Sequence, residues 1–183
     1  MSRAFLLSLA FLSACARPSP PLEIFGTVPG FQLTSHKNAS FDSALELKGR
    51  VWVANFIFTN CTGPCPRMSS QMRQVQDAAK DLTGLRLVSI TVDPVRDTPQ
   101  VLAEYAKRQH AGDRWLFLTG EQADLHHLKR NVFLLGNVDG QLNHSTRFVL
   151  VDRQARIRGY YDTSEPDSIA RILSDIRRLE KET

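Results

Sequence analysis

The sequence predicts an α/β fold in which a mixed sheet is flanked by helices on both faces. Two apolar runs, 51–58 and 85–92, have the composition of strands that are buried on both faces of a parallel sheet. Each run is followed by a segment with apolar residues at helical spacing, so strands and helices alternate along the chain. Two later strand-like runs, 148–151 and 157–160, are separated by a connection short enough for a hairpin. The sheet should therefore be parallel in its first part and mixed at its carboxyl side.

The first long strand and the helix after it enclose two cysteines. Seven of the eight residues in 51–58 are apolar, and the run is too short to span a membrane. Pro66 suits the first position of a helix, where its missing N–H costs nothing. The spacing predicts a helix over 66–80 with an apolar stripe of Met68, Met72, Val75 and Ala79. Cys61 and Cys65 then fall in the strand-to-helix turn.

The other elements follow from the same patterns. A short hairpin is expected between 31–33 and Phe41, and the loop 93–99 ends with Thr98 as the N-cap of the next helix. The remaining expected elements are a helix over 99–109, a strand over 115–118, a helix over 121–130 and a closing helix over 167–180.

The amino-terminal residues 1–14 have the features of a signal peptide. A nine-residue apolar stretch follows a single basic residue, Arg3, and this length suits a signal segment and not a transmembrane helix. The segment ends in Leu-Ser-Ala followed by Cys15, which resembles a bacterial lipobox with Cys15 as the lipidated residue. The alternative is an ordinary secretory signal with an unrelated cysteine.

Domain organisation and localisation follow from this leader. Residues 15–22 are rich in proline and read as a stiff lipid-anchored tether, and 23–183 form the folded domain. The protein is expected to be exported and held at a membrane, facing the periplasm or the outer side of the cell envelope. Its net charge of +4 is too small and scattered to indicate nucleic-acid binding.

The pair Cys61 and Cys65 is suited to either redox or metal chemistry. Their spacing in a turn allows a disulfide or two sulfur ligands on one soft metal ion. The start of a helix carries partial positive charge, so both thiols are expected to be more acidic than a free cysteine. A purely structural role is the alternative, but a disulfide closing such a short loop would remove little chain entropy.

Topology brings one histidine toward this turn. If the strand after Ser145 is the antiparallel one, it begins at the edge where the first strand ends, and His144 opens onto the cysteines. One imidazole with two thiolates suits copper, because sulfur favours Cu(I) and nitrogen keeps Cu(II) acceptable. A loop histidine that only hydrogen-bonds its neighbours is the alternative. Met68 has a soft sulfur, but its helical stripe indicates core packing.

The chain resembles members of the Sco/SenC family, thioredoxin-like proteins that carry copper to respiratory cytochrome oxidase. The matching positions are Cys61 and Cys65 followed by Pro66, the loop Asp93-Pro94 with Arg96-Asp97-Thr98-Pro99, and His144-Ser145 leading into 148–152.

The resemblance implies a thioredoxin-like sheet and a copper site made of Cys61, Cys65 and His144, with the two cysteines also able to form a redox-active disulfide. It implies binding of Cu(I) and Cu(II), and as partners the copper-centre subunit of cytochrome c oxidase and a thiol reductant. It also marks Asp93, Arg96 and Asp97 as a candidate partner loop. For that loop, the capped start of a helix is the alternative.

One departure from the family pattern keeps a second function open. Thr62 follows Cys61, where the family usually has proline, and the segment Cys61-Thr62-Gly63-Pro64-Cys65 resembles a thioredoxin turn with one residue inserted. An exported thiol-disulfide oxidoreductase of thioredoxin type is therefore the alternative to a copper metallochaperone. A lipoprotein with neither metal nor redox chemistry is a third class.

Overall fold

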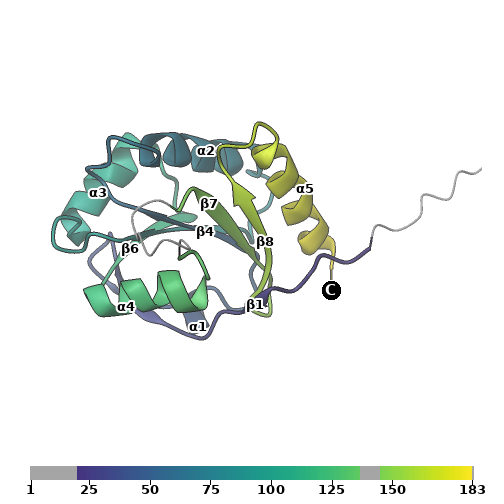
Figure 1. Ribbon diagram of the computed structural model, residues 1–183, viewed down its shortest axis with the longest axis horizontal. Helices are drawn as coiled ribbons and strands as arrows, with labels where there is room; N and C mark the ends of the chain where they lie inside the picture. Colours follow the sequence, from purple (N-terminus) through teal and green to yellow (C-terminus); the bar gives the residue numbers. More distant parts are fainter. Residues whose placement is uncertain (1–19, 137–144, 183) are drawn as a thin grey trace, which may run out of the picture.

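The computed structural model describes residues 20–136 and 145–182, and within them the chain forms one eight-stranded sheet with helices on both faces (Figure 1). The predicted signal peptide, Cys15 and His144 lie outside the described residues. The elements, in chain order, are β1 (Gly26–Thr27), β2 (Gln32–Ser35), β3 (Ser40–Asp42), α1 (Ser43–Glu46), β4 (Trp52–Ile57), α2 (Cys65–Ala78), β5 (Arg86–Thr91), α3 (Pro99–Arg108), β6 (Trp115–Thr119), α4 (Gln122–His127), the π-helix η1 (Leu128–Val132), β7 (Arg147–Val151), β8 (Arg156–Asp162) and α5 (Ser168–Lys181).

The sheet has the order β1-β8-β7-β4-β5-β6-β2-β3. Strands β4, β5 and β6 are parallel neighbours, and every other pair is antiparallel. β7 runs against β4, with Trp52 opposite Val151 and Ala54 opposite Val149, so β7 begins at the edge where β4 ends. The predicted mixed sheet is confirmed, and the strand that follows Ser145 is antiparallel to β4, as expected.

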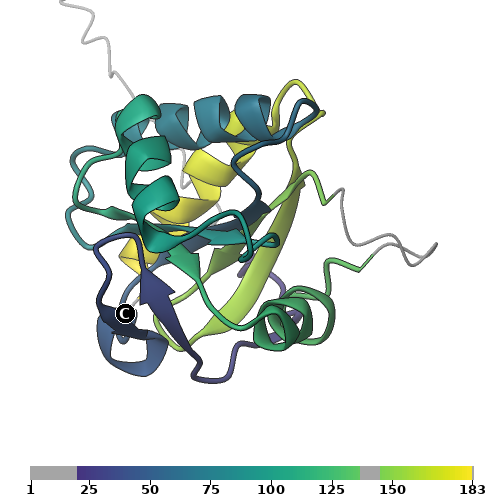
Figure 2. The ribbon, with the colours of Figure 1, turned by 90° about the vertical axis from the view of Figure 1, so that its left-hand side faces the viewer.

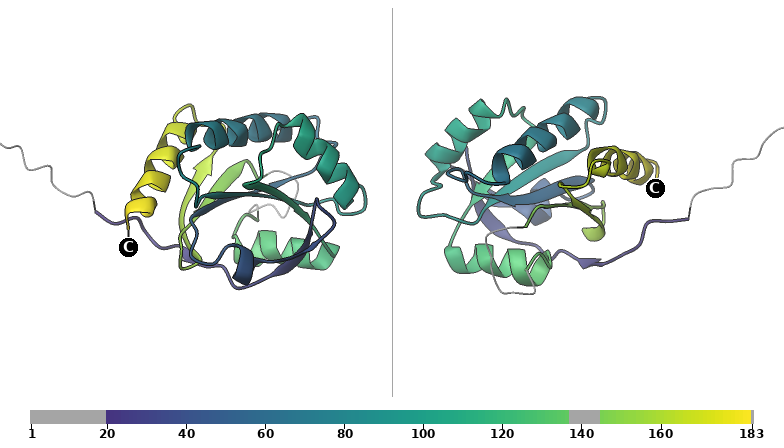
Figure 3. Two further views of the ribbon diagram at one scale, coloured as in Figure 1. Left: turned by 180° about the vertical axis from the view of Figure 1, so that it is seen from behind. Right: turned by 45° about the horizontal axis from the view of Figure 1, so that its top comes forward.

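Two cores sit on the two faces of the sheet. Figures 1 and 2 show α2, α3 and α5 covering one face, while α4 and α1 lie against the other. Alternate residues of β4 point to opposite cores: Val53 and Ile57 pack under α2, and Trp52 and Phe56 pack toward η1. A view from behind and a view with the top tilted forward show the same layering (Figure 3). The central strand is therefore buried on both faces, as its composition predicts.

The predicted stripe of α2 is confirmed, because Met68, Met72, Val75 and Ala79 are all fully buried. The hairpin of β2 and β3 is also present, and Asn38 adopts the left-handed conformation in its turn, with φ of 56°. Thr98 caps α3 by accepting a hydrogen bond from the backbone N–H of Val101.

The sequence patterns miss three features. The two-residue β1 and the four-residue α1 are too short to leave a periodic signal. The single helix expected over 121–130 is instead α4 followed by η1, where the chain widens into a π-helical turn. Within the described ranges, no helix combines the length and the apolar character needed to cross a bilayer.

Candidate metal centre

Cys61 and Cys65 lie between β4, the central strand, and α2, the helix that covers it. Cys65 is the first residue of α2, and Pro66 occupies the start of the helix as predicted. Both cysteines are free thiols, and both belong to the core under α2, with 9% and 4% of their surface exposed. The structure therefore places two neighbouring sulfur atoms in a largely dehydrated turn.

Burial sets the acidity of Cys65 in the metal-free protein. Burial first, and then a hydrogen bond with Cys61, raise the pKa of the Cys65 thiol to about 12. The backbone N–H of Phe58 acts in the opposite direction but is outweighed. The expectation of a more acidic thiol is therefore wrong for Cys65, because desolvation outweighs the positive end of the helix.

The carboxylate of Asp97 connects the loop after β5 to the segment that leads to Cys61. It accepts hydrogen bonds from the Thr59 hydroxyl at 2.5 Å and from the Thr59 backbone N–H at 3.1 Å. It also accepts a hydrogen bond of 2.6 Å from the Thr91 hydroxyl, and only 1% of Asp97 is exposed. A buried carboxylate needs such donors, and here they fix the chain two residues before Cys61.

Of the other two members of the expected partner loop, Arg96 is exposed and Asp93 is half-buried. The Arg96 guanidinium donates to the Asp93 carboxylate at 2.8 Å, and the Arg96 side chain is 70% exposed. Val95 between them is one of the most exposed apolar residues of the described chain. Asp93 and Arg96 are thus accessible to a partner, whereas Asp97 faces the cysteine turn and is not.

Hydrogen bonds connect the chain just after position 144 to α2, the helix that begins at Cys65. The Thr163 backbone N–H and hydroxyl donate to the Thr146 carbonyl at 2.9 and 2.6 Å. The Gln71 side chain of α2 donates in turn to the Thr163 carbonyl at 2.9 Å. His144 lies outside the described residues, and within those that are described no third histidine, cysteine or carboxylate joins the two thiols in a cluster.

Comparison with known proteins identifies the family to which this chain belongs. The model of the SCO1/SenC family matches residues 23–181, almost the whole described chain. The chain belongs to the SCO1/SenC family. A SCO1 protein homologue from Bacillus subtilis is 33% identical over 180 residues, which cover 93% of this chain and 92% of that protein. A putative copper-binding protein from Stutzerimonas stutzeri is 33% identical over 158 residues, covering 81% and 76% of the two chains.

Solved structures of the family share the fold. A SCO1/SenC family lipoprotein from Bacillus anthracis matches with a TM-score of 0.76 and 30% identity, covering 85% of this chain and 96% of that one. BsSco, described as a member of the Sco family of cytochrome c oxidase assembly proteins with a disulfide switch, matches with a TM-score of 0.76 and 29% identity over 88% and 98% of the chains. The expected thioredoxin-like fold is confirmed.

In this SCO1/SenC protein, sequence reasoning misses Lys129. Only 2% of this lysine in η1 is exposed, and burial lowers its pKa to about 8. A charge on Cys65 would act in the opposite direction, but the Cys65 thiol is protonated at this pH. In a regular α-helix, consecutive residues point in different directions, so a lysine directly after the buried Leu128 is not expected to be buried as well. The π-helical turn buries both residues, so no simple sequence signal could have found Lys129.

Proposed function

We propose that this protein is a copper metallochaperone that binds copper through Cys61, Cys65 and His144 and delivers it to the binuclear copper centre of cytochrome c oxidase. The observation that carries the proposal is the pair of free thiols side by side in the turn between β4 and α2. Thiolate sulfur is the ligand that Cu(I) prefers. The family membership, a copper-binding relative and a relative that assembles cytochrome c oxidase support this assignment.

The position of the described residues next to His144 supports its role as the third ligand. Strand β7 begins at the edge where β4 ends, and Thr146 is connected through Thr163 to Gln71 on α2. His144 comes two residues before Thr146, so only a short piece of chain separates it from the segment that is hydrogen-bonded to α2. We expect its imidazole to complete the copper site.

The thiol chemistry of the turn determines how copper is loaded and released. In the reduced, metal-free protein burial keeps Cys65 protonated at neutral pH, so copper must displace that proton when the thiolate forms a bond to the metal. A disulfide between Cys61 and Cys65 would remove both sulfur ligands, so a thiol reductant is needed before loading. With only three protein ligands, an incoming cysteine of the client can attack the metal and accept it by ligand exchange.

The loop between β5 and α3, which contains Asp93 and Arg96, is a suitable place for a client to bind near the cysteines. A small pocket in this loop is lined by Phe58, Val92, Asp93 and Arg96, and the neighbouring Val95 is exposed. We propose Asp93 and Arg96 as partner residues and assign Asp97 to support of the cysteine turn.

We further propose that the domain is exported through residues 1–14 and anchored by a lipid on Cys15, with 15–22 as its tether. A lipoprotein of the same family from Bacillus anthracis supports this location. Mass spectrometry of the protein from a bacterial membrane fraction should find an amino terminus at a lipid-modified Cys15. Recovery of a protein that begins elsewhere, or that carries no lipid, would contradict the anchor.

Copper titration of the reduced domain tests the proposed function. The wild-type domain should bind one equivalent of copper and develop a thiolate-to-copper charge-transfer band. Cys61→Ser and Cys65→Ser should largely abolish the band, whereas Ser70→Ala, an exposed position on α2, should leave it unchanged as the matched control. If the wild-type domain binds no copper, or if the cysteine variants bind it as tightly as the control, the chaperone function is wrong.

An exported thiol-disulfide oxidoreductase is the second candidate, favoured by the neighbouring free thiols and by the disulfide switch described for BsSco. In that reaction a Cys thiolate attacks a client disulfide, forms a mixed disulfide and releases one client thiol. The second Cys then resolves the mixed disulfide, so the client is reduced as Cys61 and Cys65 are oxidised. Single-cysteine variants that trap no mixed disulfide with a client peptide would exclude this activity.

A further inference from the structure

The two ends of the sheet differ in charge. Around the edge opposite the cysteines, the connections and the adjoining ends of strands and helices carry more basic than acidic residues: Lys48, Arg50, Lys80, Arg86, Arg114, Arg153 and Arg156 against Glu46, Asp81, Asp113 and Asp152. The carboxyl end of α5 lies at the same edge and adds Arg178 and Lys181 against Glu180 and Glu182. At the cysteine edge, the described connections and the adjoining ends of strands and helices show the reverse balance: Asp93, Asp97, Glu121, Asp162, Glu165 and Asp167 against Arg67, Arg96 and Arg147. We call the first of these the basic edge. It would meet a negatively charged surface favourably.

Several cations of the basic edge are available for an external partner. Within the described ranges, Lys48, Arg50 and Lys80 form no ion pair with a carboxylate. Arg86 and Arg114 donate to backbone carbonyls of the connection between α2 and β5, which fixes their place, and neither forms an ion pair with a carboxylate in the described part of the chain. Burial lowers the pKa of Arg86, and the neighbouring charges of Arg50 and Arg114 also lower it, outweighing the opposite effect of Glu46. These cations repel one another, so an anion at this edge would relieve the repulsion.

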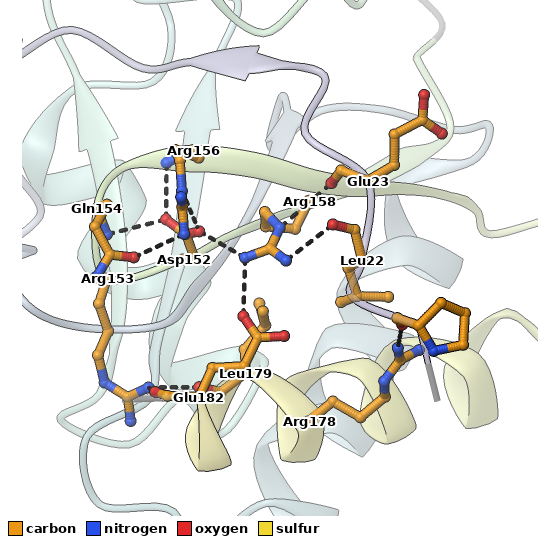
Figure 4. A network of polar contacts seen from close by, with 11 residues as sticks. Leu22, Glu23, Asp152, Arg153, Gln154, Arg156, Arg158, Arg178, Leu179 and Glu182 are labelled. Atoms are coloured by element: carbon orange, nitrogen blue, oxygen red, sulfur yellow. Dashed lines mark hydrogen bonds and ion pairs between the residues drawn. The ribbon is translucent and has the colours of Figure 1, made fainter. Parts of the chain in front are cut away.

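The amino-terminal segment joins the domain at the same edge (Figure 4). The Arg178 guanidinium of α5 donates to the carbonyl of Pro20, one of the first described residues. Arg158 of β8 donates to the carbonyl of Leu22 at 2.9 Å. Both contacts lie near the carboxyl end of α5, which packs against the β7–β8 turn through hydrogen bonds from Arg153.

Buried ion pairs hold this junction in place. The Arg158 guanidinium is almost fully buried and contacts the carboxylates of Asp152 at 2.8 Å and Glu182 at 3.0 Å. Asp152 begins the β7–β8 turn, which itself belongs to the basic edge. Only four residues separate Cys15 from Pro20, so the chain between the two α-carbons can span at most about 18 Å. A lipid on Cys15 would hold the basic edge close to a bilayer.

We propose that the basic edge is a membrane-facing surface that binds the headgroups of anionic phospholipids. The proposal rests on the lipid anchor at Cys15 that is part of the proposed function. It orients the domain with its cysteine edge away from the bilayer, where copper donors and clients can reach it. A lipid chain and a basic patch act together in membrane attachment, because each adds binding free energy that the other lacks.

Vesicle binding by the domain comprising 20–183 tests the charged surface separately from the anchor. This fragment contains every residue of both described cores, so its fold does not depend on the leader. At low salt it should co-sediment with vesicles containing phosphatidylglycerol and not with pure phosphatidylcholine vesicles, and added salt should release it. The triple variant Lys48→Gln, Arg50→Gln, Lys80→Gln should bind the anionic vesicles about tenfold less tightly or weaker still.

A matched triple variant separates location from total charge. Arg67→Gln, Arg96→Gln, Arg147→Gln removes the same charge from exposed positions at the cysteine edge and should change vesicle binding less than about twofold. Equal loss in both triple variants, or a wild-type domain without preference for anionic vesicles, would overturn the proposal. Copper titration of the Lys48, Arg50 and Lys80 variant should still give one equivalent. If the wild-type domain binds anionic vesicles but no copper, the chaperone function is wrong and the proposed membrane-facing surface is supported.

Discussion

The Thr59 hydroxyl lies 2.5 Å from the buried carboxylate of Asp97, although 38 residues separate the two along the chain. This contact joins the loop after β5 to the last residues before Cys61. The same carboxylate accepts the Thr91 hydroxyl, so one side chain organises both segments. The geometry of the cysteine turn therefore depends on a residue that is not itself a ligand.

Replacing Asp97 by asparagine should disturb both stability and copper binding. An amide can accept on only one side, so at least one buried donor among the Thr59 and Thr91 groups loses its acceptor. We expect the free energy of unfolding to fall by about 1–3 kcal/mol, as measured by urea denaturation. Copper affinity, measured by competition with a chelator, should fall as well.

Asp93→Asn is the matched control for Asp97→Asn, because Asp93 belongs to the same loop but pairs with the exposed Arg96. It should change stability by less than about 1 kcal/mol and leave copper affinity as in the wild type. If Asp97→Asn lowers stability while copper binds with unchanged affinity, Asp97 supports the fold and not the site.

Asp152 should make the protein sensitive to acid. Burial alone would raise the pKa of Asp152, but hydrogen bonds from Arg156, Arg158 and the backbone outweigh it and lower the pKa below its usual value of 3.8. A carboxyl group with a lowered pKa stabilises the fold above its unfolded pKa, and this contribution is lost as the pH falls through the folded value. Denaturation midpoints should therefore drop below about pH 4.

Asp152→Asn tests this assignment. At neutral pH it leaves the buried Arg158 without its main counter-charge, which should cost about 3–5 kcal/mol of unfolding free energy. The difference from the wild type should shrink as the pH falls below about 4, because the wild-type carboxyl is then protonated too. Asp77→Asn, in the exposed pair with Arg73, should change stability by less than about 1 kcal/mol at any pH. A difference that does not depend on pH would contradict the account.

Lys129 should lower stability at neutral pH, because burial disfavours its charged form. The pKa of this lysine is about 8 in the folded state and 10.5 in the unfolded state. Between these two pH values the unfolded state binds more protons than the folded state, so the free energy of unfolding rises with pH in this range. Lys129→Met should remove that rise and stabilise the protein at pH 7. The measurement is the difference in denaturation midpoint between variant and wild type from pH 7 to 10, in which the effect of Cys65 titration largely cancels. An equal difference across the range would show that Lys129 acts through packing alone.

The sequence predicts the central fold well because its signals are local. The continuous apolar run 51–58 and the helical stripe of Met68, Met72 and Val75 are clear local signals, and the structure buries them as expected except for the half-buried Phe58. The antiparallel placement of β7 follows from the short connection to β8 and from the rule that parallel strands share an edge. Contacts between residues that are far apart in the sequence are harder to predict, because no local pattern indicates that Thr59 contacts Asp97.

The site departs from expectation where burial competes with local electrostatics. A helix start favours a thiolate, but the sequence cannot give the depth at which Cys65 lies, and depth raises the thiol pKa. Lys129 is missed for a related reason, because a π-helical turn changes which residues face inward. Both errors concern the dielectric environment of a charge, which tertiary packing decides.

The central claim is that one histidine, His144, joins Cys61 and Cys65 on copper. The most direct measurement is electron paramagnetic resonance of the Cu(II)-loaded domain, prepared with ordinary and with ¹⁵N-labelled histidine. The account predicts coupling from a single histidine nitrogen that changes with the label, is lost in His144→Ala and is retained in His110→Ala. A spectrum without histidine coupling, or one that His144→Ala leaves unchanged, would contradict the proposed copper site.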